Sequence, residues 1–233
     1  MTTTTKKTKY DPIVPAAALT PHGLTQYGKH KIQHASITEG IANLMGSEKA
    51  DLIYSDPPWG QGNIKFWQTT NAKMNPEWKK QDLDLQNFLH TLMGFYKNYS
   101  RPGAHILIEY GQQWHDELVR TASHYGLIHG GSTKLQYRSG SKLLPLDLLV
   151  FGNGTAPSIP AGFMDEVRDT YGYPTLKVVF KHFAVPGGMV LDPCCGMGYT
   201  AQAAIDFGMT FRGNEMNHKR LQVTANRLFK TMH

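Results

Sequence analysis

The stretch GMVLDPCCGMGYT, residues 188–200, is the strongest indication of the fold in this sequence. A short apolar run is followed by an acid, Asp192, and by two glycines, Gly196 and Gly198, and a segment with helical spacing begins at residue 200. Glycine allows a tight turn and a close approach of the backbone to a ligand. A buried strand, a glycine turn and a helix in this order are typical of the units that build a parallel α/β sheet.

The rest of the chain repeats the alternation of strand and helix. Six more runs, apolar and often β-branched, predict strands at 31–36, 51–55, 105–110, 127–138, 146–152 and 210–215. Helical spacing predicts helices at 83–98, 114–126, 175–184, 200–208 and 217–232. Such alternation implies parallel pairing and helices on both faces of a sheet. We therefore predict one Rossmann-like α/β domain with a seven-stranded, mostly parallel sheet.

Length and composition exclude several classes of protein. A chain of 233 residues suits one domain with a sizeable core, and no segment approaches the ~20 apolar residues of a membrane span. Residues 1–10 lack the apolar stretch of a signal peptide and predict a disordered basic lead, so we assign the domain to 11–233. The adjacent Cys194 and Cys195 form neither a disulfide framework nor a structural zinc site, which favours a reducing cytoplasm and no metal.

The net charge of +6 is compatible with a nucleic-acid partner, because distributed Lys and Arg release counterions from a polyanion. The charge is not diagnostic, since many basic proteins bind no nucleic acid. It supports such a partner only together with other features.

A second acid stands where a nucleoside site needs one. The predicted strand 210–215 ends in Glu215, roughly 20 residues after the glycines, where a carboxylate can accept hydrogen bonds from ribose hydroxyls. Taken singly, the glycines fit an ordinary turn and Glu215 fits a solvated acid at a helix start. The chain lacks the Gly-Lys-Ser/Thr of phosphate loops, and Asp192 would attract an ammonium. S-adenosylmethionine, with a ribose and an ammonium, is the ligand that fits this set.

The segment SDPPWG, residues 55–60, follows the predicted strand 51–55. Pro57 and Pro58 cannot donate backbone hydrogen bonds, and Trp59 is a large apolar side chain to leave at a strand exit. A stiff loop with a packed tryptophan would explain the segment without any chemistry. If this strand adjoins the strand before the glycine turn, however, both loops face one cleft, and catalysis becomes the better interpretation.

DPPW together with DPCCGMGYT, residues 192–200, resembles the amino-methyltransferases that methylate the exocyclic amine of adenine or cytosine in DNA. A catalytic tetrapeptide that precedes the cofactor loop is the permuted order of their β group. In that group a segment like HPTQKP comes before the cofactor loop, and this chain has YPTLKVVF at 173–180. The resemblance extends over residues 31–230 and implies a methyltransferase domain with permuted order.

The resemblance also implies a role for each residue. Asp56 and the carbonyl of Pro57 accept the two hydrogens of the target amine, Pro58 stiffens the turn, and Trp59 stacks on a base turned out of its duplex. The methyl group moves by direct displacement, so positioning carries most of the rate. The cofactor-binding residues implied are Asp192, Cys194, Gly196, Gly198, Thr200, Glu215, Thr175 and Lys177.

The chain departs from the family at three places. The strand before DPPW usually carries a Gly-Asp pair whose acid contacts the cofactor adenine, and here Ala35 and Ser36 stand instead. Tyr173 replaces a usual His, and Cys194 and Cys195 stand where aromatic residues are usual. We expect both thiols to be small buried fillers, because no histidine adjoins them in sequence to activate a nucleophile.

The predicted substrate is the N6 amine of adenine in double- or single-stranded DNA, because Asp in the tetrapeptide resembles the adenine enzymes. The N4 amine of cytosine, the N6 amine of adenine in RNA, and a catalytically silent subunit that binds cofactor or nucleic acid are alternatives. The resemblance also allows a homodimer. A compact chain with a basic lead would suit a phage or mobile-element enzyme.

Sequence recognition is predicted to be short or relaxed. Only residues 153–172 occupy the gap in which the β group carries its recognition region, so phosphate contacts would hold the DNA. The segment 61–80 is expected to be a mobile loop that closes over the flipped base. The expected nucleic-acid-binding residues are Lys65, Trp67, Lys79, Lys80, Arg138 and Lys142.

Overall fold

Eight strands form a single mixed sheet in the described part of the chain. The computed structural model describes residues 18–81, 83–139 and 141–230, and the strand order is β1-β2-β8-β7-β3-β4-β6-β5. The strands are β1 (Leu24–Tyr27), β2 (His30–Gln33), β3 (Ala50–Ser55), β4 (Ser100–Gly111), β5 (Leu127–Ser139), β6 (Lys142–Asn153), β7 (Met189–Asp192) and β8 (Thr210–Asn214). The parallel pairs are β2/β8, β8/β7, β7/β3 and β3/β4. The predicted lead at 1–10 and the side chain of Arg138 lie outside the described residues.

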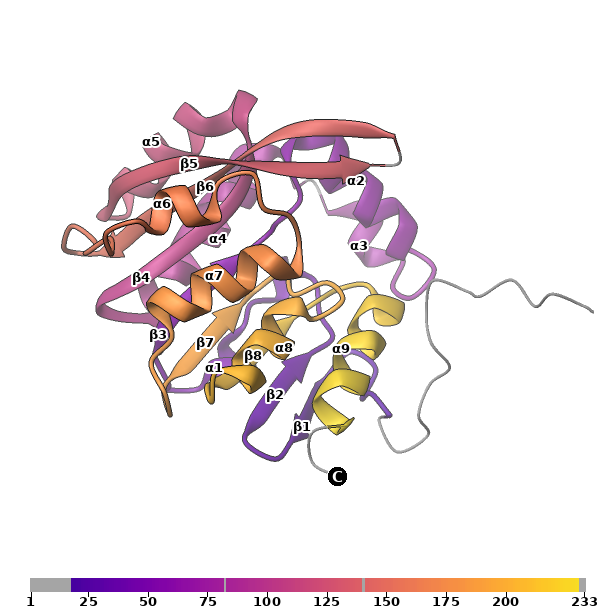
Figure 1. Ribbon diagram of the computed structural model, residues 1–233. Helices are drawn as coiled ribbons and strands as arrows, with labels where there is room; N and C mark the ends of the chain where they lie inside the picture. Colours follow the sequence, from indigo (N-terminus) through magenta and orange to yellow (C-terminus); the bar gives the residue numbers. More distant parts are fainter. Residues whose placement is uncertain (1–17, 82, 140, 231–233) are drawn as a thin grey trace, which may run out of the picture.

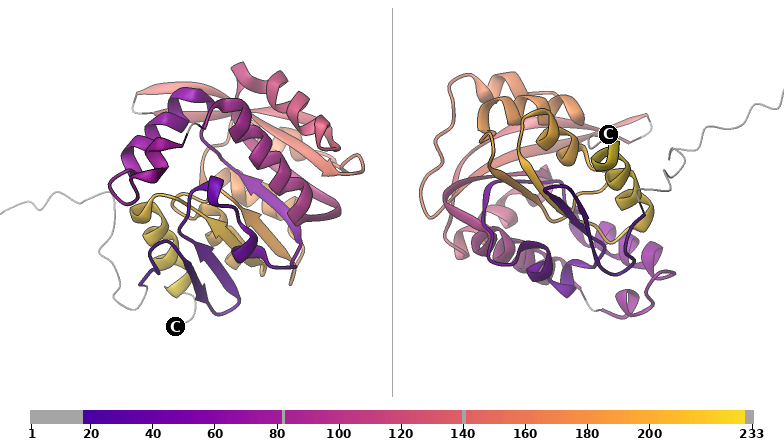
Figure 2. Two further views of the ribbon diagram at one scale, coloured as in Figure 1. Left: turned by 180° about the vertical axis from the view of Figure 1, so that it is seen from behind. Right: turned by 90° about the horizontal axis from the view of Figure 1, so that it is seen from below.

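Helices cover both faces of this sheet. They are α1 (Ala42–Met45), α2 (Gly60–Asn71), α3 (Glu77–Lys80), α4 (Leu85–Tyr99), α5 (His115–His124), α6 (Phe163–Val167), α7 (Tyr173–Phe183), α8 (Tyr199–Asp206) and α9 (His218–Lys230). Figure 1 shows α7, α8 and α9 on one side of the sheet, and the reversed view in Figure 2 shows α2 and α4 on the other. Within the described ranges, no helix has the length and apolar character to cross a membrane.

Side chains that alternate along the strands divide the core into two layers. On β3, Leu52 and Tyr54 belong to the layer under α6, α7, α8 and α9, whereas Ile53 belongs to the layer under α1, α2, α4 and α5. On β4, Leu107 and Ile108 alternate in the same way. Because both faces are covered, the central strands are almost continuously apolar, and their runs are recognisable in the sequence.

The predicted count of seven strands is wrong by one. Each of the seven predicted runs overlaps a strand, although the run 31–36 extends past the end of β2, and β1 pairs antiparallel with β2 as an eighth strand at the edge of the sheet. Its sequence is LTQY, of which only Tyr27 is buried. A short edge strand with one buried side chain carries no apolar run, so the sequence pattern does not reveal it.

The segment 61–80, expected as a mobile loop, is mostly helical. α2 and α3 occupy it, and Trp78 of α3 is fully buried and donates its indole N–H to Glu39. The amide of Gln68 in α2 donates to the carbonyls of Trp78 at 3.3 Å and Gln81 at 3.1 Å. The expectation of a loop is therefore wrong, because tertiary contacts stabilise helices that the polar sequence hardly marks.

Candidate active site

The two loops with unusual chemistry leave neighbouring strands. β3 pairs in parallel with β7, where Ile53 lies opposite Leu191, and with β4, where Tyr54 lies opposite Leu107. The chain proceeds from β3 to β4 on one side and from β7 to β8 on the other, so the strand order reverses at the β3/β7 boundary. Ligands of open α/β sheets bind beyond the carboxyl ends of the strands at such a point.

A cavity of about 290 Å³ opens beyond these strand ends. This volume is near the ~300 Å³ lower end of small-molecule sites. α2 and the β5–β6 hairpin contribute two of its walls, and Figure 1 shows the hairpin reaching toward α2. The lining residues are Ala35, Ile37, Asp56, Pro57, Pro58, Trp59, Asn63, Trp67, Phe88, Tyr137, Leu144, Pro193, Cys194, Asn214, Glu215, Met216 and Arg220.

All four residues of the DPPW tetrapeptide line this cavity. Asp56 directly follows β3, and its carboxylate accepts a hydrogen bond from Trp59 Nε1 at 3.3 Å. Asp56 and Pro57 each precede a proline, which disfavours the helical backbone conformation, and α2 starts only after the tetrapeptide. The Trp59 ring meets Tyr137 of the hairpin edge to face, with centroids 5.2 Å apart. The turn therefore holds an acid, a fixed carbonyl and an aromatic ring on one wall.

A buried glutamate close to Asp56 is a site residue that the sequence analysis missed. Glu109 of β4 is 8% exposed and accepts a hydrogen bond from the Tyr54 hydroxyl. Burial raises the pKa of Glu109, and the charge of Asp56 raises it further. Asp56 is exposed to the cavity, yet desolvation by the surrounding protein raises its pKa too. The positive charge of Arg220 and the hydrogen bond from Trp59 act in the opposite direction and lower it. Because the pKa of Glu109 is raised further than that of Asp56, we assign the negative charge at neutral pH to Asp56 and the proton to Glu109.

Asp192 holds the start of the glycine loop from inside. Its Oδ1 accepts the backbone N–H of Cys194 at 3.1 Å, and its Oδ2 accepts the Thr200 hydroxyl at 2.6 Å. The side chain is 3% exposed and is not among the lining residues. Burial raises the pKa of Asp192 to about 7. Its charge can therefore act on a ligand only from behind the cavity wall.

This buried acid gives a prediction for stability. The folded protein keeps the Asp192 proton up to a pKa of about 7, whereas the unfolded chain releases it at roughly pH 4. The stability that this proton contributes is complete below the unfolded pKa and is lost as the pH rises through the folded one. The free energy of unfolding of Asp192→Asn, measured in urea, should therefore rise relative to that of the wild type as the pH increases from roughly 4 to 8. A difference independent of pH would contradict the raised pKa.

Glu215, which follows β8, ties the glycine loop to the next strand. Its Oε2 accepts the N–H of Gly196 at 3.0 Å, and its Oε1 accepts the N–H of Asn217 at 2.7 Å. Gly196 and Gly198 have φ angles of 53° and 76°, in the left-handed region that favours glycine. Glu215, which is predicted to bind a ribose, thus both stabilises the loop and lines the cavity.

Thr175 and Lys177, which the resemblance implied as cofactor ligands, are not among the lining residues. Thr175 is fully buried in α7 and shares a hydrogen bond with Thr170 at 2.9 Å. Lys177 is exposed, with its ammonium over the Tyr173 ring at 5.4 Å. Their roles stay predictions, and the structure holds both side chains with other partners.

Of the predicted nucleic-acid-binding residues whose side chains are described, one lines the cavity and the other four are exposed lysines. Trp67 lines the cavity, and the Arg220 guanidinium lies 4.8 Å from the centre of its ring. Lys65 of α2, Lys79 and Lys80 of α3, and Lys142 of β6 are exposed. None of these lysines is among the lining residues, and their role in DNA binding stays a prediction.

The described residues offer neither thiolate nor metal chemistry. Burial raises the pKa of both Cys194 and Cys195 well above the ordinary range, so the thiols stay protonated. No group of three or more His, Cys, Asp or Glu side chains among these residues could hold a metal ion. Cys195 is buried, as predicted, whereas Cys194 is only partly buried and lines the cavity, so the prediction of a buried filler is wrong for Cys194.

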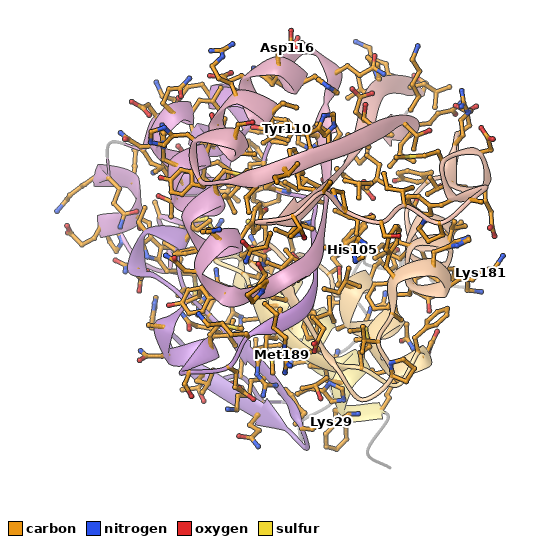
Figure 3. The ribbon with its side chains drawn as sticks, turned by 90° about the vertical axis from the view of Figure 1, so that its left-hand side faces the viewer. Lys29, His105, Tyr110, Asp116, Lys181 and Met189 are labelled. Carbon is orange, nitrogen blue, oxygen red and sulfur yellow. The ribbon has the colours of Figure 1, made fainter. Side chains whose placement is uncertain are left out.

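A second cavity, of about 480 Å³, opens at the amino ends of β7 and β8. Lys29 and Met189 line it, and Figure 3 shows both in the lower part of the view, away from Tyr110 near the carboxyl end of β4. Both of its acids are paired with basic side chains of the same cavity, as Glu48 is with Arg212 at 2.9 Å and Asp51 with Arg101 at 3.0 Å. The cavity at the carboxyl ends is therefore the better candidate for an active site.

Solved structures with a similar fold include M1.HpyAVI, TTHA0409 and the PvuII DNA methyltransferase. M1.HpyAVI, also solved as a complex with SAM, superposes with a TM-score of 0.61 over 84% of this chain and 97% of its own, at 16% identity. TTHA0409 from Thermus thermophilus, described as a candidate DNA modification methylase, gives 0.60 over 86% and 95%, at 15% identity. The cytosine-N4-specific PvuII enzyme gives 0.59 over 90% and 88%, at 11% identity.

The chain shares the fold of these three structures. No protein-family model matches its sequence, and no curated protein matches it either. In this methyltransferase fold the cavity lies where the tetrapeptide and the glycine loop meet.

Proposed function

We propose that this chain is a DNA methyltransferase that uses S-adenosylmethionine to methylate the N6 amine of adenine, with the β-group order of tetrapeptide before cofactor loop. One observation carries the proposal: Asp56 to Trp59 line the same cavity as Cys194 of the glycine loop and Glu215. Direct transfer requires the catalytic turn and the nucleoside site to share one cleft. The fold common to this chain and the PvuII DNA methyltransferase supports methyl transfer to DNA, without selecting adenine over cytosine.

The residues around the cavity fit S-adenosylmethionine. Gly196 and Gly198 adopt the left-handed turn and let α9 approach the loop closely, and Glu215 presents a carboxylate to the cavity. Asp56 in the wall provides negative charge for a cationic ligand, and Asp192 holds the start of the loop behind it. When bound, the cofactor supplies an electrophilic methyl group. The full proposed set is Asp192, Cys194, Gly196, Gly198, Thr200 and Glu215, with Thr175 and Lys177 carried over from the resemblance.

The tetrapeptide would activate the amine by positioning and by electrostatics. An exocyclic amine is a poor nucleophile because its lone pair is conjugated into the base. Asp56 and the Pro57 carbonyl would accept its two hydrogens and stabilise the charge that develops on nitrogen. Protonated Glu109 leaves the negative charge on Asp56, and the Trp59 ring offers a surface for a flipped base.

Cytosine N4 is the second candidate target. The observation in its favour is the fold shared with the cytosine-N4-specific PvuII methyltransferase. Adenine is preferred because the tetrapeptide begins with Asp, as in the adenine enzymes that it resembles.

The deciding experiment is transfer of radiolabelled methyl from S-adenosylmethionine to unmodified duplex DNA, single-stranded DNA and RNA, with products resolved as nucleosides. We expect label in N6-methyladenine from DNA. Label in N4-methylcytosine would select the second candidate, and label in RNA alone would reassign the substrate. No label despite cofactor binding would favour a silent subunit.

Specificity is proposed to be short or relaxed, with residues 153–172 as the small recognition segment. Apart from α6, this segment forms no helix or strand of its own between β6 and α7 in the described structure. Methylation mapping on a mixed genomic substrate should therefore give sites of few defined bases. A single recognition site of six or more base pairs would contradict this proposal.

A further inference from the structure

Arg220 of α9 is a charged cavity residue to which neither the tetrapeptide nor the glycine loop gives a role. It lines the cavity together with two acids, Asp56 and Glu215, and is the basic member of the described lining set. Its guanidinium forms no hydrogen bond or ion pair with the described residues, although its backbone N–H donates to Asn217 Oδ1 at 3.0 Å. Its positive charge opposes the rise of the Asp56 pKa, but no hydrogen bond joins the two side chains, so the guanidinium N–H groups can still donate to a ligand anion.

Packing holds this guanidinium in one position. Its central carbon lies 4.8 Å from the centre of the Trp67 ring, which is cation–π geometry. A Cβ built on Gly196 would lie only 2.5 Å from Arg220 Nη2, so the guanidinium also packs against the glycine turn. Asn217 donates to Asn71 Oδ1 at 2.8 Å and ties the start of α9 to the end of α2. The cation is therefore preorganised between the cofactor loop and α2.

The charges of the cavity match a zwitterion. Two carboxylates and one guanidinium line it, and the amino-acid part of S-adenosylmethionine carries one ammonium and one carboxylate. Lys177, the cation that the resemblance offered for the cofactor, is exposed and is not among the lining residues. Among the described side chains, this leaves Arg220 as the cation that a carboxylate in the cavity would meet.

We propose that Arg220, packed between Trp67 and the glycine turn, binds the carboxylate of the amino-acid part of the cofactor. This inference rests on the proposed use of S-adenosylmethionine. A DNA phosphate is the competing anion. It is disfavoured because the guanidinium packs on the glycine turn inside the cavity, whereas the exposed lysines of α2, α3 and β6 already offer contacts to a backbone outside it.

The test is isothermal titration of the full chain with S-adenosylmethionine and with its decarboxylated analogue, which keeps the ammonium, the sulfonium and the adenosine. The wild type should bind the cofactor roughly 10- to 100-fold more tightly than the analogue, as expected for a charge-assisted contact. Arg220→Gln should lose that preference and bind both with similar affinity. Lys219→Gln, a neighbouring exposed lysine that does not line the cavity, should behave as the wild type.

Three results would overturn the assignment. Equal affinity of the wild type for both ligands would do so without any variant, even if Arg220→Gln failed to fold. A uniform loss of affinity for both ligands in Arg220→Gln would mean that the arginine only shapes the wall. Unchanged cofactor binding with a raised KM for DNA would assign it to a phosphate. A wild type that binds neither ligand would instead refute the proposed function itself.

Discussion

Replacing Asp56 with asparagine is expected to lower the rate of methyl transfer by about 10²- to 10³-fold. Asparagine keeps the volume of the side chain and can still accept the hydrogen bond from Trp59 Nε1 at its remaining oxygen. It removes the negative charge from the cavity wall and presents an amide N–H₂ where the target amine needs an acceptor. The loss should fall on kcat, because the interaction strengthens as charge develops on the amine nitrogen.

Cofactor binding separates this effect from unfolding. Affinity for S-adenosylhomocysteine, measured by titration, should change by less than about fivefold in Asp56→Asn, since the loop and Glu215 stay intact. Asp116→Asn, at an exposed aspartate on α5, is the matched control and should keep full activity. An Asp56→Asn enzyme with normal kcat would remove Asp56 from the mechanism and leave the tetrapeptide as a structural turn.

The same carboxylate should set the acid side of the pH–rate profile. Since the cavity walls raise the pKa of Asp56, its active, ionised form is lost as the pH falls through a value above the ordinary pKa of roughly 4. The kcat should therefore decline with falling pH well before the protein unfolds, which circular dichroism can follow in parallel. A flat profile down to about pH 4 would show that Asp56 titrates as an ordinary aspartate.

The sequence predicts the elements of this fold unevenly, for physical reasons. Strands buried on both faces, such as β3 and β7, are continuously apolar, so their runs identify them. β1 is an edge strand with one buried side chain, and its pattern is too weak to recognise. α2 has polar positions on most of its surface and is stabilised by contacts of Gln68 with α3, which no local pattern encodes.

The sequence also predicts some residues of the candidate site and misses others. Asp56 to Trp59 and the glycine loop are contiguous in sequence, so their chemistry could be interpreted before their position was known. Arg220 and Tyr137 join the cavity only through the packing of α9 and the β5–β6 hairpin. Glu109 left a signal, a glutamate inside the apolar run HILIEY, but its meaning depends on the neighbouring strand that carries Asp56.

Gly198→Ala is expected to destabilise the protein by about 3 kcal/mol or more and to abolish tight cofactor binding. Gly198 has a φ of 76°, and a Cβ there would lie 2.6 Å from Thr224 Oγ1 and 2.9 Å from Thr224 Cα. The second contact is with backbone, so a change of rotamer cannot relieve it. α9 would have to move away from the loop, which would also strain the 3.1 Å hydrogen bond from the Thr224 hydroxyl to the Gly196 carbonyl.

Gly208→Ala isolates the cost of the backbone conformation from the cost of the contact. Gly208 has a similar φ of 71°, but a Cβ there would meet no atom within 4 Å. Alanine at this position should therefore cost only about 1 to 2 kcal/mol, the usual penalty of a left-handed residue. Urea unfolding of both variants gives the difference directly. Equal losses would mean that the loop and α9 separate easily, and the close approach of Gly198 to Thr224 would then not be what fixes the cofactor loop.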